Sequence, residues 1–204
     1  MNGDSPVLVD SQMGYNFVRY RGRYFALPMS QGNVSLESAE PGDYLSALTL
    51  DAAERMAFSE WVEENQPSEP SLFKQLWDWN LVYYDGSYYA IPLEAGEVCL
   101  MDMEAREELP YADTLEDLWQ ELVEQVRTGM SNQEPVLITS QQGFNVVCYQ
   151  GVFIGLPERI GNVRLEEAGL ERVREKVVKK NLHDCLDAIS KAKRMGHFWA
   201  WMSK

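Results

Sequence analysis

Residues 16–36 read NFVRYRGRYFALPMSQGNVSL, and this stretch decides the fold because it occurs three times. The second copy, residues 80–100, reads NLVYYDGSYYAIPLEAGEVCL, and the third, residues 145–165, reads NVVCYQGVFIGLPERIGNVRL. The copies align without a gap from residues 6, 70 and 135, at offsets of 64 and then 65 residues. Repetition at a fixed period is typical of structural units that bury their apolar faces against one another. Ten positions carry the same residue in all three copies, and in the first copy they are Pro6, Leu8, Asn16, Val18, Tyr20, Gly22, Pro28, Gly32, Val34 and Leu36.

Each copy predicts a β-hairpin. Apolar and polar residues alternate before Arg21-Gly22, as they do in a half-buried strand. The second copy has Asp85-Gly86 at this place, and Asp-Gly favours a two-residue hairpin turn because glycine accepts a positive φ. The second strand then ends at Pro28, which cannot donate a hydrogen bond to a sheet. We expect one more strand at residues 6–10 and short third strands around Val34, Val98 and Val163.

Helical patterns follow the copies. Residues 50–63 predict a helix with Thr49 as its N-cap. A second helix is predicted after Asp113, with Glu116 completing a capping box and Gly129 ending the helix. Residues 101–108, between these helices, predict an acidic, polar connection. The longest helical pattern runs from about residue 166 to residue 195, and an interruption near Asn181 is an open alternative.

These patterns predict an α+β protein. It contains three internal repeats, each an antiparallel β-hairpin plus a short strand followed by a helix, in an approximately pseudo-threefold arrangement. We expect one domain over residues 1–204, because a single unit of about 65 residues would bury little surface alone. Its predicted parts are repeat 1 at 6–66, repeat 2 at 70–130, repeat 3 at 135–170 and a basic C-terminal helical tail at 171–204.

Composition and charge narrow the function classes. A hydrophobic content of 45% and an aromatic content of 11% are those of a folded globular protein. Residues 1–170 carry 9 Lys and Arg against 28 Asp and Glu, whereas residues 171–204 carry 9 against 4, which gives net charges of −19 and +5. An acidic body argues against nucleic acid as a partner, because phosphates need a cationic surface. No apolar run approaches the roughly 20 residues of a membrane span, and the N-terminal residues lack a secretory pattern, so we expect a cytoplasmic protein.

The sequence contains no catalytic motif that we can identify, and we expect a protein that is not an enzyme. Its two histidines, His183 and His197, both lie near the C-terminus, and no phosphate loop, dinucleotide motif or nucleophile elbow is present. No residue pattern predicts a metal site or a cofactor. Cys99, Cys148 and Cys185 are odd in number and unpaired in spacing, and we expect all three to be buried thiols.

Two sets of repeated polar side chains are candidate ligand-binding residues. Asn16, Asn80 and Asn145 are either local backbone partners at the start of a strand or ligand contacts presented three times. Tyr20, Tyr84 and Tyr149 are either cross-strand packing residues or a platform for a sugar.

Several aromatic residues outside the repeated pattern are also candidates. Phe198, Trp199 and Trp201 give the chain an aromatic end, which either docks on its own fold or binds a partner. Trp77 and Trp79 replace a glycine-containing segment of the other copies, and we expect them in the core.

The hairpin pattern resembles a short bacterial repeat, GYNIVxYxGxYYAxPxxxGxxDL, associated with glycosyltransferase and polysaccharide-related proteins. Residues 14–18 (GYNFV) and 143–147 (GFNVV) match its opening, and the resemblance covers about 25 residues of each copy. The sequence departs from it at the penultimate Asp of the pattern, where Ser35, Cys99 and Arg164 stand. The resemblance implies an accessory role in glycan metabolism and no particular reaction.

Three functions follow as hypotheses, of which the last and least favoured is a small enzyme that uses carboxylates alone. The first is a non-catalytic protein-interaction or scaffold protein built from three β-repeats, with a protein as its partner. The alternative is a carbohydrate-binding accessory module whose ligand is a saccharide. We expect neither a nucleic-acid partner nor a membrane span.

Overall fold

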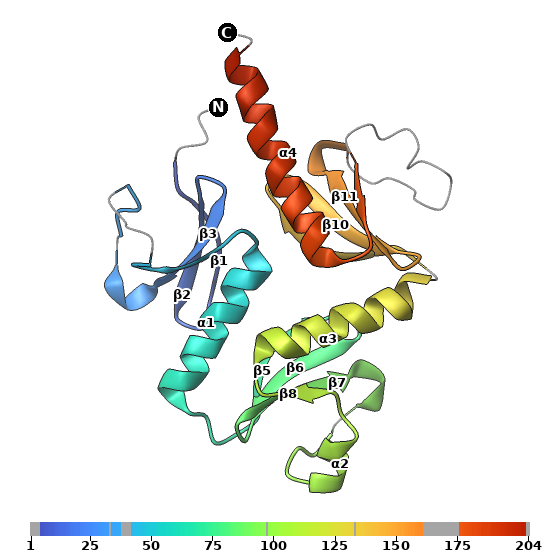
Figure 1. The fold of residues 1–204 in the computed structure, drawn as a ribbon. Helices are drawn as coiled ribbons and strands as arrows, with labels where there is room; N and C mark the ends of the chain where they lie inside the picture. Colours follow the sequence, from blue (N-terminus) through green and yellow to red (C-terminus); the bar gives the residue numbers. More distant parts are fainter. Residues whose placement is uncertain are drawn as a thin grey trace.

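The structure is a computed structural model, which describes residues 5–32, 34–37, 42–96, 98–132, 134–160 and 176–202. For residues 132, 160 and 193–202 it describes the backbone alone. The fold is α+β, as predicted, with three four-stranded antiparallel sheets. Figure 1 shows the sheets spread around three long helices, α1, α3 and α4.

The chain forms three units in sequence order. The first contains β1 (Val7–Gln12), β2 (Tyr15–Tyr20), β3 (Arg23–Pro28), η1 (Met29–Gln31), β4 (Leu45–Ala47) and α1 (Leu50–Asn65). The second contains β5 (Ser71–Leu76), β6 (Trp79–Tyr84), β7 (Ser87–Pro92), η2 (Leu93–Ala95), α2 (Met103–Glu107), β8 (Tyr111–Ala112) and α3 (Leu115–Thr128). The third contains η3 (Met130–Asn132), β9 (Val136–Gln141), β10 (Phe144–Tyr149), β11 (Val152–Pro157), η4 (Glu158–Ile160), β12 (Val177–Lys179) and α4 (Leu182–Met202). In each sheet, strands that follow one another in the sequence pair as neighbours.

The predicted hairpins are confirmed in all three units. Arg21 and Gly22 both have positive φ, at 48° and 77°, as a two-residue turn of type I′ requires. Asp85-Gly86 and Gln150-Gly151 make the same turn between β6 and β7 and between β10 and β11. The strand predicted at residues 6–10 is also present, but it extends to Gln12 and forms a second hairpin with β2.

The short third strands predicted around Val34 and Val98 are wrong. Both valines lie outside strands and pack in small clusters against the outer faces of their sheets, and Val163 lies outside the described residues. The positive φ of Gly32 and Gly96 turns the chain over these outer faces instead of along the sheet edge. The strands that complete the sheets, β4, β8 and β12, come later in the sequence.

The helix predictions are confirmed in part. Thr49 caps α1 as expected, with its side chain accepting a hydrogen bond from Ala52 N, and α1 ends two residues later than predicted. The cap of α3 is Thr114, not Asp113, because the Thr114 side chain accepts from Asp117 N. Gly129 ends α3 as predicted. The acidic connection after the second hairpin contains a short helix, α2, capped by Asp102.

The long C-terminal helix is divided at the interruption considered near Asn181. The β-branched pair Val177-Val178 joins β11 as strand β12, and the Asn181 side chain then accepts a hydrogen bond from Asp184 N at the start of α4. The helix continues to Met202, beyond the end predicted near residue 195. Residues 166–175 lie outside the described part.

Sheets and helices alternate along the chain. Phe58 of α1 lies in one buried cluster with Phe73 of the second sheet, and the two rings stack at 4.8 Å. Trp119 of α3 lies in another buried cluster with Ile138 of the third sheet. A helix therefore packs on its own sheet and on the first strand of the next unit, which forms two junctions between units.

Trp77 and Trp79 lie at the second of these junctions. They are half-buried, contact the clusters on both sides and meet edge to face at 6.4 Å. Trp77 Nε1 donates a hydrogen bond of 2.9 Å to Leu137 O of the third unit. The two residues that break the repeated pattern thus join two units.

Of the three cysteines, Cys148 and Cys185 are buried as predicted. The prediction for Cys99 is wrong, because its thiol is exposed. Cys99 lies in the loop after η2 instead of in a strand, so no second layer covers it.

Candidate functional site: the groove between the first unit and α4

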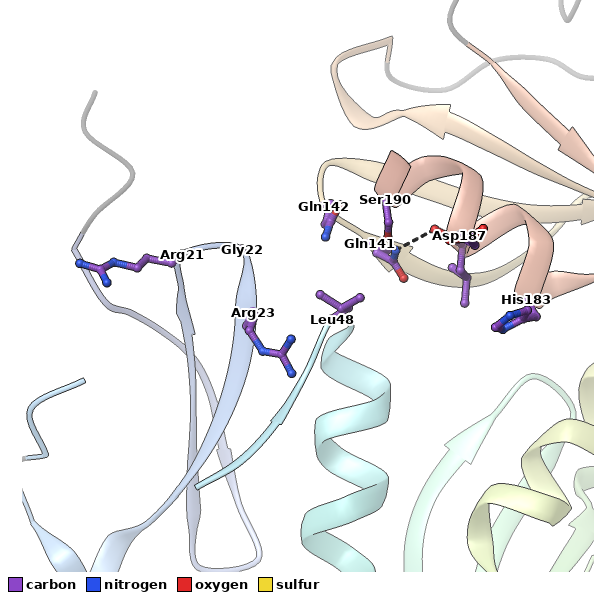
Figure 2. Close-up of a pocket in the computed structure, with 10 residues that line it drawn as sticks. Arg21, Gly22, Arg23, Leu48, Gln141, Gln142, His183, Asp187 and Ser190 are labelled. Carbon is purple, nitrogen blue, oxygen red and sulfur yellow. Dashed lines mark hydrogen bonds between the residues drawn. The ribbon is translucent and has the colours of Figure 1, made fainter. Parts of the chain in front are cut away.

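A groove of about 760 Å³ lies between the first unit and α4. Arg21, Gly22, Arg23 and Leu48 form one wall, from the β2–β3 turn and the segment before α1. The other wall consists of Gln141, Gln142, His183, Leu186, Asp187 and Ser190. Figure 2 shows the two walls facing each other across open space. The groove therefore lies where the first and third units meet.

The first wall carries two arginines on one hairpin turn. The Arg23 side chain points toward Leu48 and the start of α1, whereas Arg21 points away from the groove (Figure 2). Arg23 Nη2 donates to Ser46 O and to Ser46 Oγ, each at 3.2 Å. A guanidinium has five N–H donors, so these contacts orient Arg23 without using all of its hydrogen-bonding capacity.

The second wall is fixed by Gln141. Its side chain is 2% exposed, and Nε2 donates to Leu186 O at 3.1 Å and to Ser190 Oγ at 2.8 Å. These bonds tie the end of β9 to the first turns of α4 and set the position of this helix. His183 is exposed on the same helix, and Asp187 pairs with Lys191 at 2.5 Å. The wall thus presents an imidazole and a carboxylate opposite Arg23.

A smaller hollow of about 300 Å³ continues the groove toward α3. Thr49, Arg55, Trp119 and Thr139 are among its lining residues. Arg55 is 6% exposed, its Nε donates to Glu116 Oε2 at 2.9 Å, and its guanidinium lies 4.0 Å from the centre of the Trp119 ring. This buried cation joins α1 to α3 through an ion pair and a cation–π contact.

Lys74 is the centre of a polar cluster that involves all three units. Its Nζ donates to Asp51 at 2.9 Å and to Glu54 at 2.6 Å, and Thr139 Oγ1 donates to the other Asp51 oxygen at 3.0 Å. Burial lowers the pKa of Lys74, but the charges and hydrogen bonds of the two carboxylates outweigh that effect and raise the pKa above its usual value. Lys74 is thus a fixed cation that links the units and is held in place beside the hollow.

Two features that could support catalysis would be clusters of metal ligands and reactive thiols among the described residues of the fold. Among them, no group of three or more His, Cys, Asp or Glu side chains could hold a metal ion. Burial raises the pKa of Cys185 to about 11 and also raises the pKa of Cys148, which leaves little of the nucleophilic thiolate at neutral pH. No helix of the described part is long and apolar enough to cross a membrane.

The candidate asparagines lie on the second strand of each sheet, and the structure does not bring them together. Asn16 Oδ1 accepts a hydrogen bond of 2.7 Å from Ser11 Oγ across the hairpin, and Asn145 Oδ1 accepts one of the same length from Ser140 Oγ. Asn80 is half-buried opposite Gln75. The observed partner of Asn16 and Asn145 is thus a serine side chain of the neighbouring strand. The two interpretations of these residues had named the local backbone or a ligand instead.

The candidate tyrosines lie on the outer faces of the three sheets. Tyr20 is buried in a cluster with Val18, Leu27 and Leu36. Tyr84 and Tyr149 are half-buried against equivalent clusters of the second and third sheets. Phe198, Trp199 and Trp201 lie in the last turns of α4, and their side chains are outside the described part of the structure.

None of the residues that line the groove is among the candidate binding residues named from the sequence. A signal was present in the sequence. Met13, Trp77 and Gln142 occupy equivalent positions of the three copies, and Met13 and Trp77 both pack at a junction between units. The third copy differs in carrying a polar residue at this position. The first hairpin turn is also the one copy with an arginine on both sides of its glycine. Comparison of the differences between the copies would therefore have identified both walls.

Comparisons with protein-family models, curated proteins and solved structures found no match for this chain.

Proposed function

We propose that the protein is a non-catalytic interaction protein, which binds a segment of a partner protein in the groove between the first unit and α4. The observation that carries this proposal is the groove itself. It is open, it has a volume of about 760 Å³, and its walls come from two units. Leu48 and Leu186 supply apolar surface, while Arg23, His183 and Asp187 supply polar groups that can fix the orientation of a bound chain.

The charge of the groove favours an acidic segment. The first 170 residues have a net charge of −19, so the cationic Arg23 on the groove wall is locally distinct from its surroundings. Guanidinium groups bind carboxylates through paired N–H donors, and Arg23 retains donors for such a contact. We infer a partner segment that carries Asp or Glu next to an apolar residue.

The architecture is consistent with a scaffold role. We propose that the three units are copies of one repeat in a single domain, arranged around an approximate threefold axis. Support comes from the shared strand order, the ten identical positions and the clustering of residues from α1, α3 and α4 around the smaller hollow. Such an arrangement presents several sheet faces to partners inside the cell.

The carbohydrate-binding alternative, including its resemblance to a polysaccharide-related repeat, remains a prediction. Asn16 and Asn145 already use their side-chain oxygen in a bond to serine, and none of the residues that line the groove is Phe, Tyr or Trp. These observations make the groove a less suitable sugar site. Sugar binding would therefore have to use other surfaces. The test below also covers this alternative.

The experiment is a pull-down from source-cell lysate with the wild-type protein and Arg23→Glu as baits. Bound proteins and glycans are identified by mass spectrometry. We expect a protein that wild type captures and Arg23→Glu loses. Arg19→Glu is the matched control, because Arg19 is exposed on the neighbouring strand and outside the groove, so it should retain the partner. Capture that is equal for all three baits, or recovery of a saccharide without a protein, would contradict the proposal.

A further inference from the structure

The first strand of each sheet contains a β-bulge at the same position. The bulged residues are Val9, Phe73 and Ile138, as the register of each strand with its neighbour shows. In the second sheet, Phe73 and the next residue, Lys74, both lie on the face that packs against helices. A bulge of this kind places two consecutive side chains opposite one residue of the neighbouring strand.

A helix of the preceding unit covers the bulge in the second and third sheets. Phe73 is 6% exposed and stacks on Phe58 of α1, while the next residue, Lys74, pairs with Glu54 of the same helix. Ile138 is 3% exposed in the cluster that contains Trp119 of α3. Each covered bulge therefore has an apolar contact with the helix that precedes it in the chain, and the second adds an ion pair.

Within the described part of the chain, no helix covers the equivalent site in the first sheet. Val9 is 43% exposed, and its neighbours Val7 and Leu8 are exposed as well, which leaves three consecutive apolar residues at a sheet edge. Asp10, at the position of Lys74, is exposed, and its carboxylate accepts a hydrogen bond from Ser11 N. We call residues 7–10 the open bulge. It is uncovered with α4 of the same chain in place, and none of its residues lines the groove.

α1 covers the bulge of the second sheet and α3 covers that of the third, so α4 is the next helix that could cover a bulge. Leu182, Cys185 and Ile189 pack it on the third sheet. The sequence places Met195, Phe198, Trp199 and Met202 at the i, i+3, i+4, i+7 spacing of one helix face, which is turned by about 120° from the packed face at 3.6 residues per turn. Residues 190–204 contain four Lys or Arg and no Asp or Glu. The end of α4 therefore combines the apolar stripe and the positive charge that Val9 and Asp10 would need.

We propose that the C-terminal half of α4 docks on the open bulge of a second copy of this chain. The interface continues the helix-on-next-sheet contact of the two junctions within the chain. The charges of the proposed ion pair are reversed relative to the first junction. There the strand supplies the cation Lys74 and the helix supplies the anion Glu54. In the proposed interface the strand supplies the anion Asp10 and the helix supplies the cations. The inference goes beyond the proposed function and uses a surface separate from the groove.

A helix fits the open bulge better than a strand would. The bulge interrupts the regular ladder of the β1 edge, and this hinders pairing with an added strand. The contact is also heterologous, since α4 of one copy meets β1 of the next, and it extends into chains unless the rotation closes a ring. Four residues form a small patch, so we expect association at high protein concentration only.

The experiment is sedimentation velocity of the full chain over a wide concentration range. We expect the wild-type weight-average sedimentation coefficient to rise with concentration, and Val9→Lys to raise the dissociation constant by about tenfold or more, as for a central interface residue. Asp10→Lys is a second variant at an exposed position that should act in the same direction. Leu72→Lys is the matched control, because Leu72 is an exposed leucine on the equivalent strand of the second sheet and should not change association.

A mixing experiment tests the head-to-tail geometry. Val9→Lys retains the helix end, and the double variant Phe198→Asp, Trp199→Asp retains the open bulge. Neither should associate alone, but their mixture should form a heterodimer and nothing larger. Circular dichroism of each variant verifies folding.

A wild type that stays monomeric at every concentration, or a mixture that forms no heterodimer, would overturn the inference. The proposed function would still stand if a partner is captured in an Arg23-dependent way. Self-association without any captured partner would support the inference and contradict the proposed function.

Discussion

Gly155 should be a glycine for a steric reason, and replacement by alanine tests it. The equivalent residues of the other sheets are Ala26 and Ala90, both buried. A Cβ on Gly155 would lie 2.8 Å from Ile189 Cδ1, 3.2 Å from Ile189 Cγ1 and 3.4 Å from Val177 Cβ. We expect Gly155→Ala to destabilise the protein, because α4 approaches the third sheet too closely for a methyl group.

The magnitude follows from two opposing effects. In an unobstructed strand, alanine would stabilise the protein by roughly 0.5–1 kcal/mol relative to glycine. Overpacking a well-filled core costs about 1–3 kcal/mol, and Ile189 cannot easily move because it is fully buried and β-branched on a helix. The free energy of unfolding should therefore fall by about 1 kcal/mol, the difference between the middle values of the two ranges.

The assay is urea unfolding at 25 °C, followed by tryptophan fluorescence and analysed with a common m-value. Ile189→Val removes the Cδ1 atom of the closest contact and should cost about 0.5–1.5 kcal/mol by itself. In that background, Gly155→Ala should have no cost or a small benefit, which gives a coupling energy of about 1 kcal/mol or more. A stabilising Gly155→Ala in the wild-type background, or equal costs in both backgrounds, would refute the steric reasoning.

Three further predictions concern thiols, a helix cap and pH. A thiol reagent should label Cys99 alone in the folded protein and should reach Cys148 and Cys185 only on unfolding, which mass spectrometry of labelled peptides can measure. Thr114→Ala should lower the free energy of unfolding by about 1 kcal/mol in urea melts through loss of the N-cap of α3, and the corresponding change at Asp113 should have a smaller effect. Burial and the hydrogen bond to Glu60 raise the pKa of Tyr15, so the unfolded state loses the phenol proton at lower pH than the folded state does. The free energy of unfolding should therefore fall above pH 10, by up to about 1.4 kcal/mol per pH unit from this group. Tyr15→Phe should make the urea midpoint fall less steeply with pH.

Local sequence chemistry was enough to predict the hairpins and, to within two residues, the ends of α1 and α3. Two-residue turns such as Arg21-Gly22 and caps such as Thr49 depend on backbone preferences of a few neighbouring residues, so the pattern is visible in one chain. The strands that complete each sheet were missed because β4 and β12 have three residues each and β8 has two. Segments this short lack a detectable period, and only pairing with β3, β7 or β11 defines them.

The candidate site could not be predicted from motifs, because it is made by contacts between units. Gln141, which fixes α4, and Arg23, which lines the facing wall, are 118 residues apart in the sequence. Asn16 and Tyr20 attracted attention because they are repeated. The Asn16 contact recurs in the third hairpin and the Tyr20 contact in all three. Apart from Gly22, the hairpin residues that line the groove instead occupy positions at which the copies differ. In a repeat protein, identity between copies reports the shared fold, and differences indicate where one copy has acquired a separate role.

The strict sequential pairing of strands has a consequence for biosynthesis. Every strand bonds to its nearest predecessor or successor, so no sheet has to wait for a distant segment to be translated. Contacts close in sequence form quickly, and N-terminal parts of a chain can fold while the remainder is on the ribosome. The first sheet and α1 can therefore assemble early, and each later sheet finds a helix already formed on which to pack.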